Sequence, residues 1–519
     1  MALLLALDSG TSMVKAVAFT AAGEVVASAC RPNRVDVPGP ALAEQCMERT
    51  WNDAAAVLAE LAERVAGQEI AGLAVTGQGD GTWLVDGDDR PVGPALLWLD
   101  ARAAGSVEHL HETGAARSAF VHTGTGLNAC QQSAQLVWLR EHEPERLRRV
   151  VRALHCKDWL YLNLTGVAAA DPSEACFTWG DYRTRTYRDE VLQALGAADL
   201  ARLLPPVVDG AAASHPLRPE VAARTGLPAG LPVVLAYVDV VCTGLGAGLY
   251  GAGEGEAGVS ILGSTGMHLR LVPDPALVSP SPEGTGYCMC FPVPGHVMQA
   301  QTTMAVTLSV EWLIGLVEGS ATLAGLPAPD RGAVLRALDA AVSRARPGAA
   351  VYHPFISAAG ERGPFRDADA RAGLFGFDRS AGLPELARAV FEGIGLASRD
   401  CYAALGGAPA EVRVTGGGAR SDAMRAILAA CLDRPVRGAA HDEAGAAGAA
   451  MTAAVCLGLF PDMAACAAAW LRGGGPASPP DPALARTYDA LFPIYRDAYA
   501  AMPPLWRRLR QARETNHAA

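Results

Sequence analysis

The sequence lacks the features that mark several common protein classes. Its 12 cysteines form no C-x-x-C pair and no cluster with histidine at zinc-binding spacing, which argues against a zinc site. Charged residues make up only 19% of the 519 residues, and the formal net charge is −11. This acidic balance excludes the basic surface that nucleic-acid binding requires. No G-x-x-x-x-G-K-[S/T] loop is present, so a nucleotide would need another kind of phosphate site.

The cysteines are scattered along the chain, as in a protein that keeps its thiols reduced. Only Cys288 and Cys290 lie close together, and their spacing places both on one face of a strand more readily than on a metal ion. Scattered, unpaired cysteines are typical of proteins in a reducing compartment. We therefore expect a cytoplasmic protein with free thiols.

Two apolar segments raise the question of a membrane. Residues 1–7 carry no basic leader and meet Asp8 too early for a signal-peptide core, so we expect a buried strand there. Residues 444–460 are uncharged but consist mostly of alanine and glycine, whose transfer into lipid is only weakly favourable. This composition predicts a buried, close-packed helix and no membrane partner.

The length of the chain and the order of its apolar segments predict two α/β lobes. A chain of 519 residues can form more than one core, because single cores seldom exceed about 300 residues. Short apolar runs alternate with longer segments of helical periodicity. We expect strands at residues 3–7, 14–19, 70–75, 233–236, 259–262 and 411–414, and helices at residues 50–65, 134–141, 384–405 and 421–432.

An approximate internal repeat gives the two lobes a related element. Near the start, a strand runs into Asp8-Ser-Gly-Thr-Ser12 and a second strand follows; half a chain later, a strand runs into Gly263-Ser-Thr-Gly266 and another follows. Glycine lets the backbone approach a ligand, and N–H and hydroxyl groups can bind phosphate oxygens. Either turn alone is common in β-rich proteins. Two of them at half-chain spacing predict a clamp for a triphosphate between the lobes.

The lobes are divided at a glycine-rich crossing, residues 244–256. This division predicts an N-terminal lobe of residues 1–248, a C-terminal lobe of residues 249–487 and a tail of residues 488–519. Residues 488–513 have the pattern of an amphipathic helix, whose basic end comprises Arg507, Arg508, Arg510 and Arg513. A solvated terminal helix accounts for this pattern, and a basic partner site is the alternative.

One carboxylate suits a catalytic role. Asp239 follows the strand expected at residues 233–236 and precedes a run of small residues. Phosphoryl transfer to a hydroxyl requires phosphate positioning, a divalent metal and a carboxylate that takes the proton of the hydroxyl. An aspartate at the end of a strand is otherwise often the N-cap of a helix. The pattern at Asp239 is compatible with both interpretations.

Six motifs in one order resemble the FGGY family of carbohydrate kinases, and the resemblance extends over nearly the whole chain. Residues 8–15 and 263–266 are similar to the two phosphate motifs of the family. Its substrate loop and the following strand correspond to residues 77–80 and 97–102, its signature region to residues 359–376, and its adenosine site to residues 415–421 with 443–448.

The resemblance implies the fold shared by sugar kinases, heat-shock chaperones and actin: two α/β lobes, each similar to ribonuclease H, with the active site in the cleft between them. It implies ATP as phosphoryl donor and Mg²⁺ held through water by Asp8. Asp239 matches the catalytic base of the family. For Lys15, contact with phosphate and a strand lysine that extends to solvent both stay open. The ATP-binding positions carried over are Gly10, Thr11, Ser12, Lys15, Gly263, Ser264, Gly416, Gly417 and Ser421.

The substrate side of the pocket departs from the family in several places. Gly79 stands where glycerol kinases have an arginine, which we expect to leave more room. Val240 replaces an amide that binds substrate in glycerol and xylulose kinases, and Tyr237 and Val238 replace small residues. We therefore expect the pocket to bind its substrate through a different set of contacts. The substrate-binding positions carried over are Gln78, Asp80, Gln131 and Asp239.

Two tryptophans near these positions have two interpretations. Trp83 and Trp98 lie close to the substrate loop in the sequence and are candidates to line the pocket. Aromatic residues on strands are more often part of a hydrophobic core.

The acceptor implied by the resemblance is a small polyol or sugar. Residues 78–85 and 156–174 are most similar to family members that phosphorylate erythritol, which would give erythritol 4-phosphate, and next to L-xylulose kinases. A pentulose or glycerol kinase is the alternative within the family. An actin-like or chaperone-like ATPase without a small acceptor is the alternative outside it. A homodimer stays open.

Overall fold

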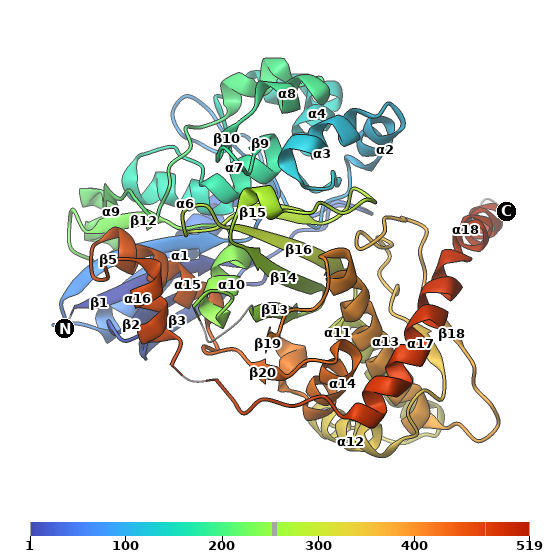
Figure 1. The fold of residues 1–519 in the computed structure, drawn as a ribbon. Helices are drawn as coiled ribbons and strands as arrows, with labels where there is room; N and C mark the ends of the chain where they lie inside the picture. The colour runs from blue at the N-terminus through green and yellow to red at the C-terminus, as the bar shows by residue number, and fades with distance from the viewer. Residues whose placement is uncertain (1, 252–256, 473, 518–519) are drawn as a thin grey trace.

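The structure, a computed structural model, describes residues 2–251, 257–472 and 474–517. It contains two α/β lobes, each with a six-stranded mixed sheet, which confirms the fold class predicted from the sequence. The two sheets lie next to each other in the middle of the molecule, and helices surround them (Figure 1).

The first sheet has the strand order β11-β12-β5-β1-β2-β3. β2 pairs antiparallel with both β1 and β3, β5 is parallel to β1, and β12 is parallel to β5. Both faces of β1 are buried, because the strand is apolar at nearly every position. The strands are β1 (Leu3–Ser9), β2 (Met13–Phe19), β3 (Val25–Pro32), β5 (Ile70–Gly77), β11 (His215–Pro216) and β12 (Pro232–Leu235).

Five strands of the second sheet repeat this topology, while its sixth strand, β15, is added at the edge opposite to that of β11. The strand order of the second sheet is β15-β16-β14-β13-β19-β20. β14 pairs antiparallel with both β13 and β16, β19 is parallel to β13, and β20 is parallel to β19. The two hairpins, β1–β2 and β13–β14, therefore occupy equivalent positions, as the internal repeat predicts. The strands are β13 (Ala257–Leu262), β14 (Gly266–Val272), β15 (Tyr287–Cys290), β16 (Val297–Thr303), β19 (Glu411–Thr415) and β20 (Val436–Gly438).

A mainly helical cap, formed by the chain between β5 and β12, lies above the first sheet (Figure 1). Its interior is an apolar cluster separate from the core that packs against the first sheet, although α6 and α9 of the same segment belong to that core. The elements of this segment are β6 (Trp83–Val85), β7 (Ala95–Leu96), α2 (Ala104–Glu112), α3 (Ala115–Thr123), α4 (Gln132–His142), α5 (Pro144–Arg148), β8 (Arg152–Leu154), α6 (Cys156–Thr165), α7 (Pro172–Trp179), β9 (Gly180–Asp181), β10 (Thr186–Tyr187), α8 (Asp189–Ala194), η1 (Ala198–Leu203) and α9 (Pro219–Thr225).

Helices also cover the far side of the second sheet, where they form a core with β19 and β20. They are α11 (Thr307–Leu323), α12 (Arg331–Arg344), α13 (Leu383–Ala404), α14 (Asp422–Leu432) and α17 (Pro482–Ala500). The remaining elements are β4 (Glu44–Gln45), α1 (Met47–Arg64), η2 (Pro275–Leu277), β17 (Val351–His353), β18 (Gly373–Phe375), η3 (Gly417–Arg420), α16 (Met463–Trp470) and α18 (Pro503–His517).

Two helices, α10 (Asp239–Ala247) and α15 (Ala444–Cys456), cross between the sheets. α10 comes from the first half of the chain, yet its Gly244 packs against Leu269 and Met298 of the second sheet. α15 comes from the second half and packs on β1 and β5 of the first sheet. Each half of the chain therefore covers part of the sheet of the other half.

The two crossing helices touch backbone to backbone. A Cβ atom at Gly448 would lie 1.9 Å from the carbonyl oxygen of Cys242, and one at Gly246 would lie 2.1 Å from that of Ala444. No side chain fits in these spaces. This contact explains the alanine and glycine in residues 444–460, and the predicted buried helix is confirmed as α15. In the part of the chain that the structure describes, no helix is both long and apolar enough to cross a membrane.

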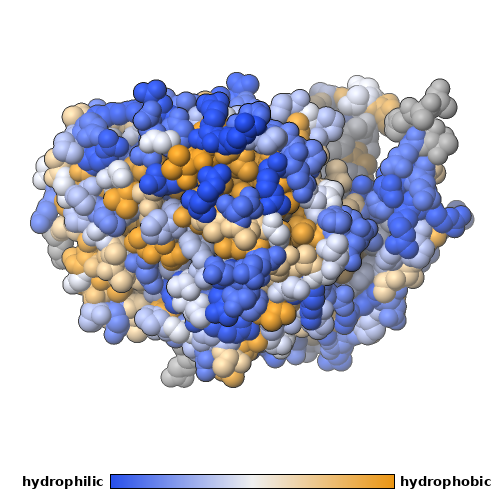
Figure 2. Space-filling view, turned by 90° about the horizontal axis from the view of Figure 1, so that it is seen from above, coloured by the Kyte–Doolittle hydropathy of each residue, from blue (hydrophilic) through white to orange (hydrophobic). Residues whose placement is uncertain are grey.

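The tail differs from its prediction. The amphipathic pattern of residues 488–513 is divided between α17 and α18, because Pro503 begins a new helix. Seen from above, α18 projects from the body with mainly hydrophilic side chains (Figure 2). Trp506 is its buried contact, at 3% exposure, and Arg510 pairs with Asp369 at 2.9 Å. Much of α18 is therefore a solvated helix.

The remaining expectations about the backbone agree with the structure. The predicted strands and helices other than the tail helix lie within a few residues of observed elements. Cys288 and Cys290 lie on β15, and all 12 cysteines are free thiols. The expected lobe boundary at residues 244–256 falls partly outside the described residues, which omit 252–256.

The backbone contact between α10 and α15 predicts a sharp effect of one methyl group. Gly448→Ala should destabilise the protein by about 1–3 kcal/mol or more, because the new Cβ overlaps a backbone oxygen that has little room to move. Gly315→Ala is the matched control in α11, since a Cβ there meets nothing within 4 Å, and it should stabilise by up to about 1 kcal/mol. Thermal unfolding of both variants measures the difference. Equal melting temperatures of Gly448→Ala and the wild type would contradict the contact.

Candidate active site

A cavity of about 230 Å³ lies where the two lobes meet. Its wall contains residues that follow or end strands of both sheets, so the strand ends of the two lobes open into one space. The polar side chains are Thr11, Gln78, Asp80, Asp239, Thr265, Tyr287, Thr302 and Arg362. The apolar wall includes Phe177, Val238, Val240, Ile261, Met289 and Met304.

Asp239 lies in this cavity as the first residue of α10. The N-cap of that helix is Val238, so the helix-cap interpretation of Asp239 does not hold. Its Oδ1 accepts a hydrogen bond from the N–H of Val240 at 2.7 Å. Burial raises the pKa of Asp239 well above its usual range, and the negative charges of Asp8 and Glu174 raise it further. A raised pKa makes the carboxylate of Asp239 a stronger base, which suits a group that accepts a proton.

Asp8 lies beside the N-terminus of α15. A Cβ at Gly445, in the first turn of α15, would lie 2.8 Å from Asp8 Oδ2, so glycine permits the close approach. Burial raises the pKa of Asp8 to about 6, while the charge of Lys15 acts in the opposite direction. Lys15 Nζ forms an ion pair with Glu443 at 2.8 Å. Lys15 is therefore engaged within the protein.

The carboxylates of Asp8 and Asp239 are close enough for the charge of one to raise the pKa of the other. Two such oxygen donors beside a cavity suit a hard divalent cation that keeps part of its water shell. The residues present therefore fit Mg²⁺ at Asp8.

The turn of the first hairpin contributes Gly10, Thr11 and Ser12. The hydroxyl of Thr11 donates to Gln78 Oε1 at 3.0 Å and accepts from Trp98 Nε1 at 2.7 Å. Asn33 fixes the backbone of the turn, because its side chain donates to the carbonyl of Gly10 and its N–H to that of Ser12. The Thr11 side chain thus belongs to the wall of the cavity, whereas Ser12 is exposed and does not line it.

The turn of the second hairpin supports the start of α11. The carbonyls of Gly263 and Ser264 accept from the N–H groups of Thr307 and Val306 at 3.0 and 2.9 Å. Gly416 has φ of 88°, and a Cβ there would lie 2.8 Å from the carbonyl of Leu262. Glycine at this position therefore lets the end of β19 contact the second hairpin.

The other residues predicted for the adenosine side come just after Gly416 in the sequence. Gly417 begins η3, between β19 and α14. Ser421 is the N-cap of α14, where its hydroxyl accepts from the N–H of Met424 at 3.0 Å and donates to Asp339. The Ser421 hydroxyl is therefore used in capping the helix.

Gln78 and Asp80 form the acceptor side of the cavity. Gln78 is 2% exposed, and its Nε2 donates to Gln45 at 2.8 Å. Asp80 has φ of 56°, and its Oδ2 accepts from the hydroxyl of Tyr287 at 3.1 Å, across the junction of the lobes. Its Oδ1 is buried without a hydrogen-bond partner among the described residues. A buried carboxylate oxygen of this kind is ready to accept a hydrogen bond from a ligand.

The extra room expected at Gly79 is not there. A Cβ at Gly79 would lie 2.5 Å from Cγ2 of Val238 and 3.5 Å from Oε1 of Glu174. Two departures from the family pattern thus compensate each other: the larger Val238 fills the space that the smaller Gly79 leaves. Tyr237, by contrast, points away from the cavity and donates to Asp209 at 2.6 Å.

The structure separates the remaining substrate-side candidates. Trp98 lines the cavity, whereas Trp83 is fully buried in the core of the first lobe. Gln131 does not line the cavity. Its Nε2 donates to the carbonyl of Gly126 at 3.1 Å and its Oε1 accepts from the N–H of Asn128 at 3.3 Å, so its amide holds its own loop together.

A fully buried ion cluster lies beside the cavity. Lys157 Nζ binds Asp158 at 2.9 Å, Asp171 at 2.6 Å and Glu174. Burial opposes the charged lysine, but the three carboxylates outweigh this effect and hold the pKa of Lys157 well above its usual range. Burial raises the pKa of Glu174 to about 7. His155 Nδ1 completes the cluster at 3.0 Å from Asp158.

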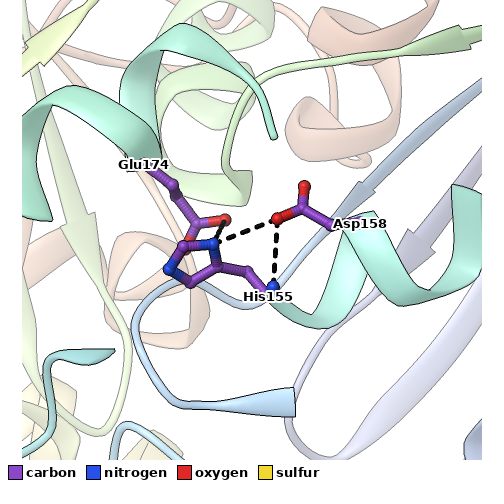
Figure 3. A group of neighbouring side chains, drawn as sticks. All are labelled: His155, Asp158 and Glu174. Carbon is purple, nitrogen blue, oxygen red and sulfur yellow. Dashed lines mark hydrogen bonds and ion pairs between the residues drawn. The ribbon is translucent and has the colours of Figure 1, made fainter. Parts of the chain in front are cut away.

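His155, Asp158 and Glu174 have the geometry of a metal site (Figure 3). A metal is not needed there, because the ammonium of Lys157 already binds the carboxylates of Asp158 and Glu174. The cluster therefore carries its own cation.

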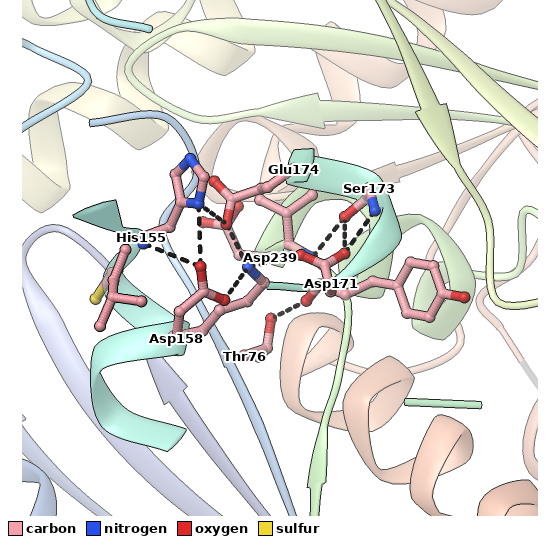
Figure 4. A network of polar contacts seen from close by, with 12 residues as sticks. Thr76, His155, Asp158, Asp171, Ser173, Glu174 and Asp239 are labelled. Carbon is pink, nitrogen blue, oxygen red and sulfur yellow. Dashed lines mark hydrogen bonds and ion pairs between the residues drawn. The ribbon is translucent and has the colours of Figure 1, made fainter. Parts of the chain in front are cut away.

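The cluster holds the backbone of the cavity in place (Figure 4). Glu174 Oε1 accepts from the N–H of Asp80 at 3.0 Å, and the hydroxyl of Ser173 accepts from the N–H of Val238 at 3.2 Å. Thr76 donates to the carbonyl of Tyr237 at 2.7 Å. The residues just before Asp239 are thus held by β5 and by α7, and α7 also holds Asp80.

Sequence reasoning missed Lys157, Tyr287 and Arg362 as parts of this region. For Lys157, a signal was available: Lys157 and Asp158 are adjacent charges in the otherwise mostly apolar sequence of α6, which indicates a buried pair. Arg362 lies within the signature region, but its sequence does not tell where the side chain points. Tyr287 gives no signal, because an aromatic residue on a strand is ordinary.

Comparison with known proteins connects this site to a family. Residues 3–246 match the N-terminal domain model, and residues 258–457 the C-terminal domain model, of the FGGY family of carbohydrate kinases. The chain is 48% identical to an erythritol kinase of Brucella abortus over 98% of both chains. It is 32% identical to a xylulose kinase of Escherichia coli over 82% of this chain and 83% of the relative. The solved structure of a xylulose kinase from Rhodospirillum rubrum superposes with a TM-score of 0.85, at 27% identity over 97% of this chain and all of that one.

The ion cluster generates a stability prediction. Lys157→Met should destabilise the protein by about 3–5 kcal/mol, because it leaves buried carboxylates without their cation. Lys15→Met is the control: its side chain is 36% exposed and has one ion pair, so the change should cost no more than about 1 kcal/mol. Denaturant unfolding compares the two. A Lys157→Met variant as stable as the wild type would show that the cluster does not depend on this cation.

Proposed function

This chain belongs to the FGGY family of carbohydrate kinases, and we propose that it transfers the γ-phosphoryl group of ATP to a hydroxyl of erythritol, giving erythritol 4-phosphate and ADP. The similarity over 98% of both chains to a relative named erythritol kinase supports this acceptor. The observation that carries the proposal is the carboxylate of Asp239, with a raised pKa, in a cavity between the lobes that also contains Gln78 and Asp80.

Asp239 acts as the general base. The hydroxyl of the polyol donates a hydrogen bond to its carboxylate, and the oxygen attacks the γ-phosphorus in line with the leaving group. The proton passes to Asp239 as the new P–O bond forms, while the bond from the γ-phosphorus to the bridging oxygen breaks and ADP leaves. Gln78 and Asp80 bind the polyol on the acceptor side, where Asp80 Oδ1 is a buried acceptor.

The donor side is formed by the two hairpin turns and the adenosine segment. The phosphates are surrounded by N–H and hydroxyl groups of the two turns, at Gly10, Thr11, Ser12, Gly263 and Ser264. Lys15, which is paired with Glu443, adds a positive charge near the phosphates. Gly416 and Gly417 let the nucleotide approach the backbone. Mg²⁺ held through Asp8 would neutralise negative charge on the phosphates during transfer. We place this reaction in the cytoplasm.

Two other activities compete with this proposal. Pentulose phosphorylation is favoured by the relatives named xylulose kinase. An ATPase without a small acceptor is disfavoured by the acceptor-side polar groups, Gln78 and Asp80, since such an ATPase does not need them.

An assay of coupled ADP release separates these activities. With ATP and Mg²⁺, the protein should turn over erythritol with a kcat/KM at least about 10²-fold above that for glycerol, ribitol, D-xylulose, L-xylulose or L-ribulose, because unpaired buried polar groups penalise the wrong acceptor. A strong preference for a pentulose would overturn the erythritol assignment. ATP turnover that no acceptor stimulates would overturn the kinase itself.

Asp239→Asn tests the base. The change keeps the shape of the side chain but removes its basicity, so kcat for erythritol should fall by about 10²–10⁴-fold. The KM for ATP and the melting temperature should change little. In the wild type, kcat/KM should fall as the pH is lowered, because Asp239 must be ionised and burial favours its protonated form. Retained turnover in Asp239→Asn would show that another group takes the proton.

A further inference from the structure

Arg362 brings a positive charge into the cavity from the second lobe. It lies on the loop between β17 and β18, and its side chain lines the same cavity as Asp80 and Asp239. Its charge acts on Asp80, whose pKa is raised by burial and lowered by Tyr287 and Arg362. Arg362 therefore faces the acceptor side of the cavity.

The backbone that presents Arg362 is held firmly. Glu361 is 1% exposed, and its Oε1 accepts from the N–H groups of Met304 and Arg362, each at 3.0 Å. On the other side, a Cβ at Gly363 would lie 2.6 Å from Gln301 Oε1, so this position sits directly on β16. An arginine on such a fixed backbone loses little further freedom when it binds a ligand.

An aromatic residue in the middle of the loop adds to this support. Phe365 stacks on Tyr499 of α17 with ring centroids 4.7 Å apart, and on Trp506 of α18 at 6.3 Å. The C-terminal helices thus brace the loop from outside the cavity.

The guanidinium of Arg362 has more N–H donors than it uses for side-chain hydrogen bonds in the described part of the protein. Among the described residues, Arg362 makes one hydrogen bond to a side chain, which one of its terminal nitrogens donates to Cys130 Sγ at 3.4 Å. An arginine has five N–H donors in a planar fork. Near it, Asp80 offers the buried Oδ1 that has no partner in the described part of the chain. Donors and an acceptor therefore meet at one place in the cavity.

We propose that Arg362 is a substrate-binding residue, which donates to an oxygen of the polyol whose hydroxyl hydrogen is accepted by Asp80. This inference rests on the proposed function. It also explains Gly79: glycerol kinases carry an arginine at that position, and here Val238 fills the space while the guanidinium comes from the opposite lobe. A hydroxyl can accept and donate at once, whereas a carbonyl oxygen can only accept. The pair of Arg362 and Asp80 therefore favours a polyol over a ketose that places its carbonyl there.

Arg362→Met tests the contact through steady-state kinetics with erythritol. The kcat/KM for erythritol should fall by about 10- to 100-fold, mostly through KM, because a hydrogen bond to a charged group is lost. The KM for ATP should stay within about twofold. The kcat/KM of Arg362→Lys for erythritol should lie between those of the wild type and Arg362→Met, since lysine keeps the charge but not the planar fork of N–H donors.

Arg366→Met is the matched control. Arg366 lies on the same loop, but it pairs with Glu108 at 3.2 Å at the surface and does not line the cavity. This variant should keep the wild-type kinetics and melting temperature. An equal rise in KM for erythritol in both variants would mean that the loop, not the contact, has been changed, and would overturn the proposal.

Deoxy analogues of erythritol locate the contact. For wild type, each missing hydroxyl should lower kcat/KM; for Arg362→Met, one of butane-1,2,4-triol and butane-1,2,3-triol should show a much smaller additional loss, because its missing hydroxyl is the one that Arg362 binds. Full additivity with both triols would overturn the proposal, as would a change confined to the KM for ATP. A wild-type protein that does not phosphorylate erythritol would instead refute the proposed function, so the two failures are distinct.

Discussion

The contact between α10 and α15 is the constraint on which the rest of the site depends. At Gly246 and Gly448, the two helices approach until backbone meets backbone, and Gly246 of α10 lies against Ala444 in the first turn of α15. Asp239 begins one helix, and Glu443 and Gly445 begin the other next to Asp8. The crossing therefore fixes the first turn of α15 against α10, next to Asp8. Small residues in these helices therefore serve the chemistry of the site as well as the packing of the lobes.

Around this crossing, the acceptor side is organised by charge that is buried rather than exposed. The ammonium of Lys157 balances three carboxylates, and two residues of the cluster region, Ser173 and Glu174, accept hydrogen bonds from the backbone at Val238 and Asp80. Buried ion pairs rarely add net stability, since desolvation offsets their attraction. Here the cluster fixes segments that are far apart in the sequence at the wall of one cavity. The second lobe adds Tyr287 and Arg362 to the same wall, so the acceptor side is complete only when both lobes are in place.

Sequence reasoning reached the features that local chemistry determines. The two hairpins follow from apolar strands joined by glycine-rich turns. Asp239 follows an apolar strand in the sequence and lines the cavity in the structure, and its role as the base stays a prediction. Sequence reasoning did not reach features that depend on distant partners. Whether Gly79 leaves room depends on Val238, which comes from another segment, and Arg362 enters the cavity from a loop of the opposite lobe. The single tail helix was wrong for a local reason, because Pro503 starts a separate helix. The assignment of Ser421 and Gln131 to ligands stays a prediction, although the structure shows both side chains bonded within the protein.

The packing of α15 on β1 and β5 also bears on how the chain matures during synthesis. The ribosome produces the whole first sheet long before it produces the helix that covers part of that sheet. During that interval the growing chain carries an apolar sheet face without its native partner, as in the aggregation-prone intermediates of large proteins. The first half of the sequence is therefore not an independent folding unit, and cutting the chain between the lobes would separate a sheet from its own cover.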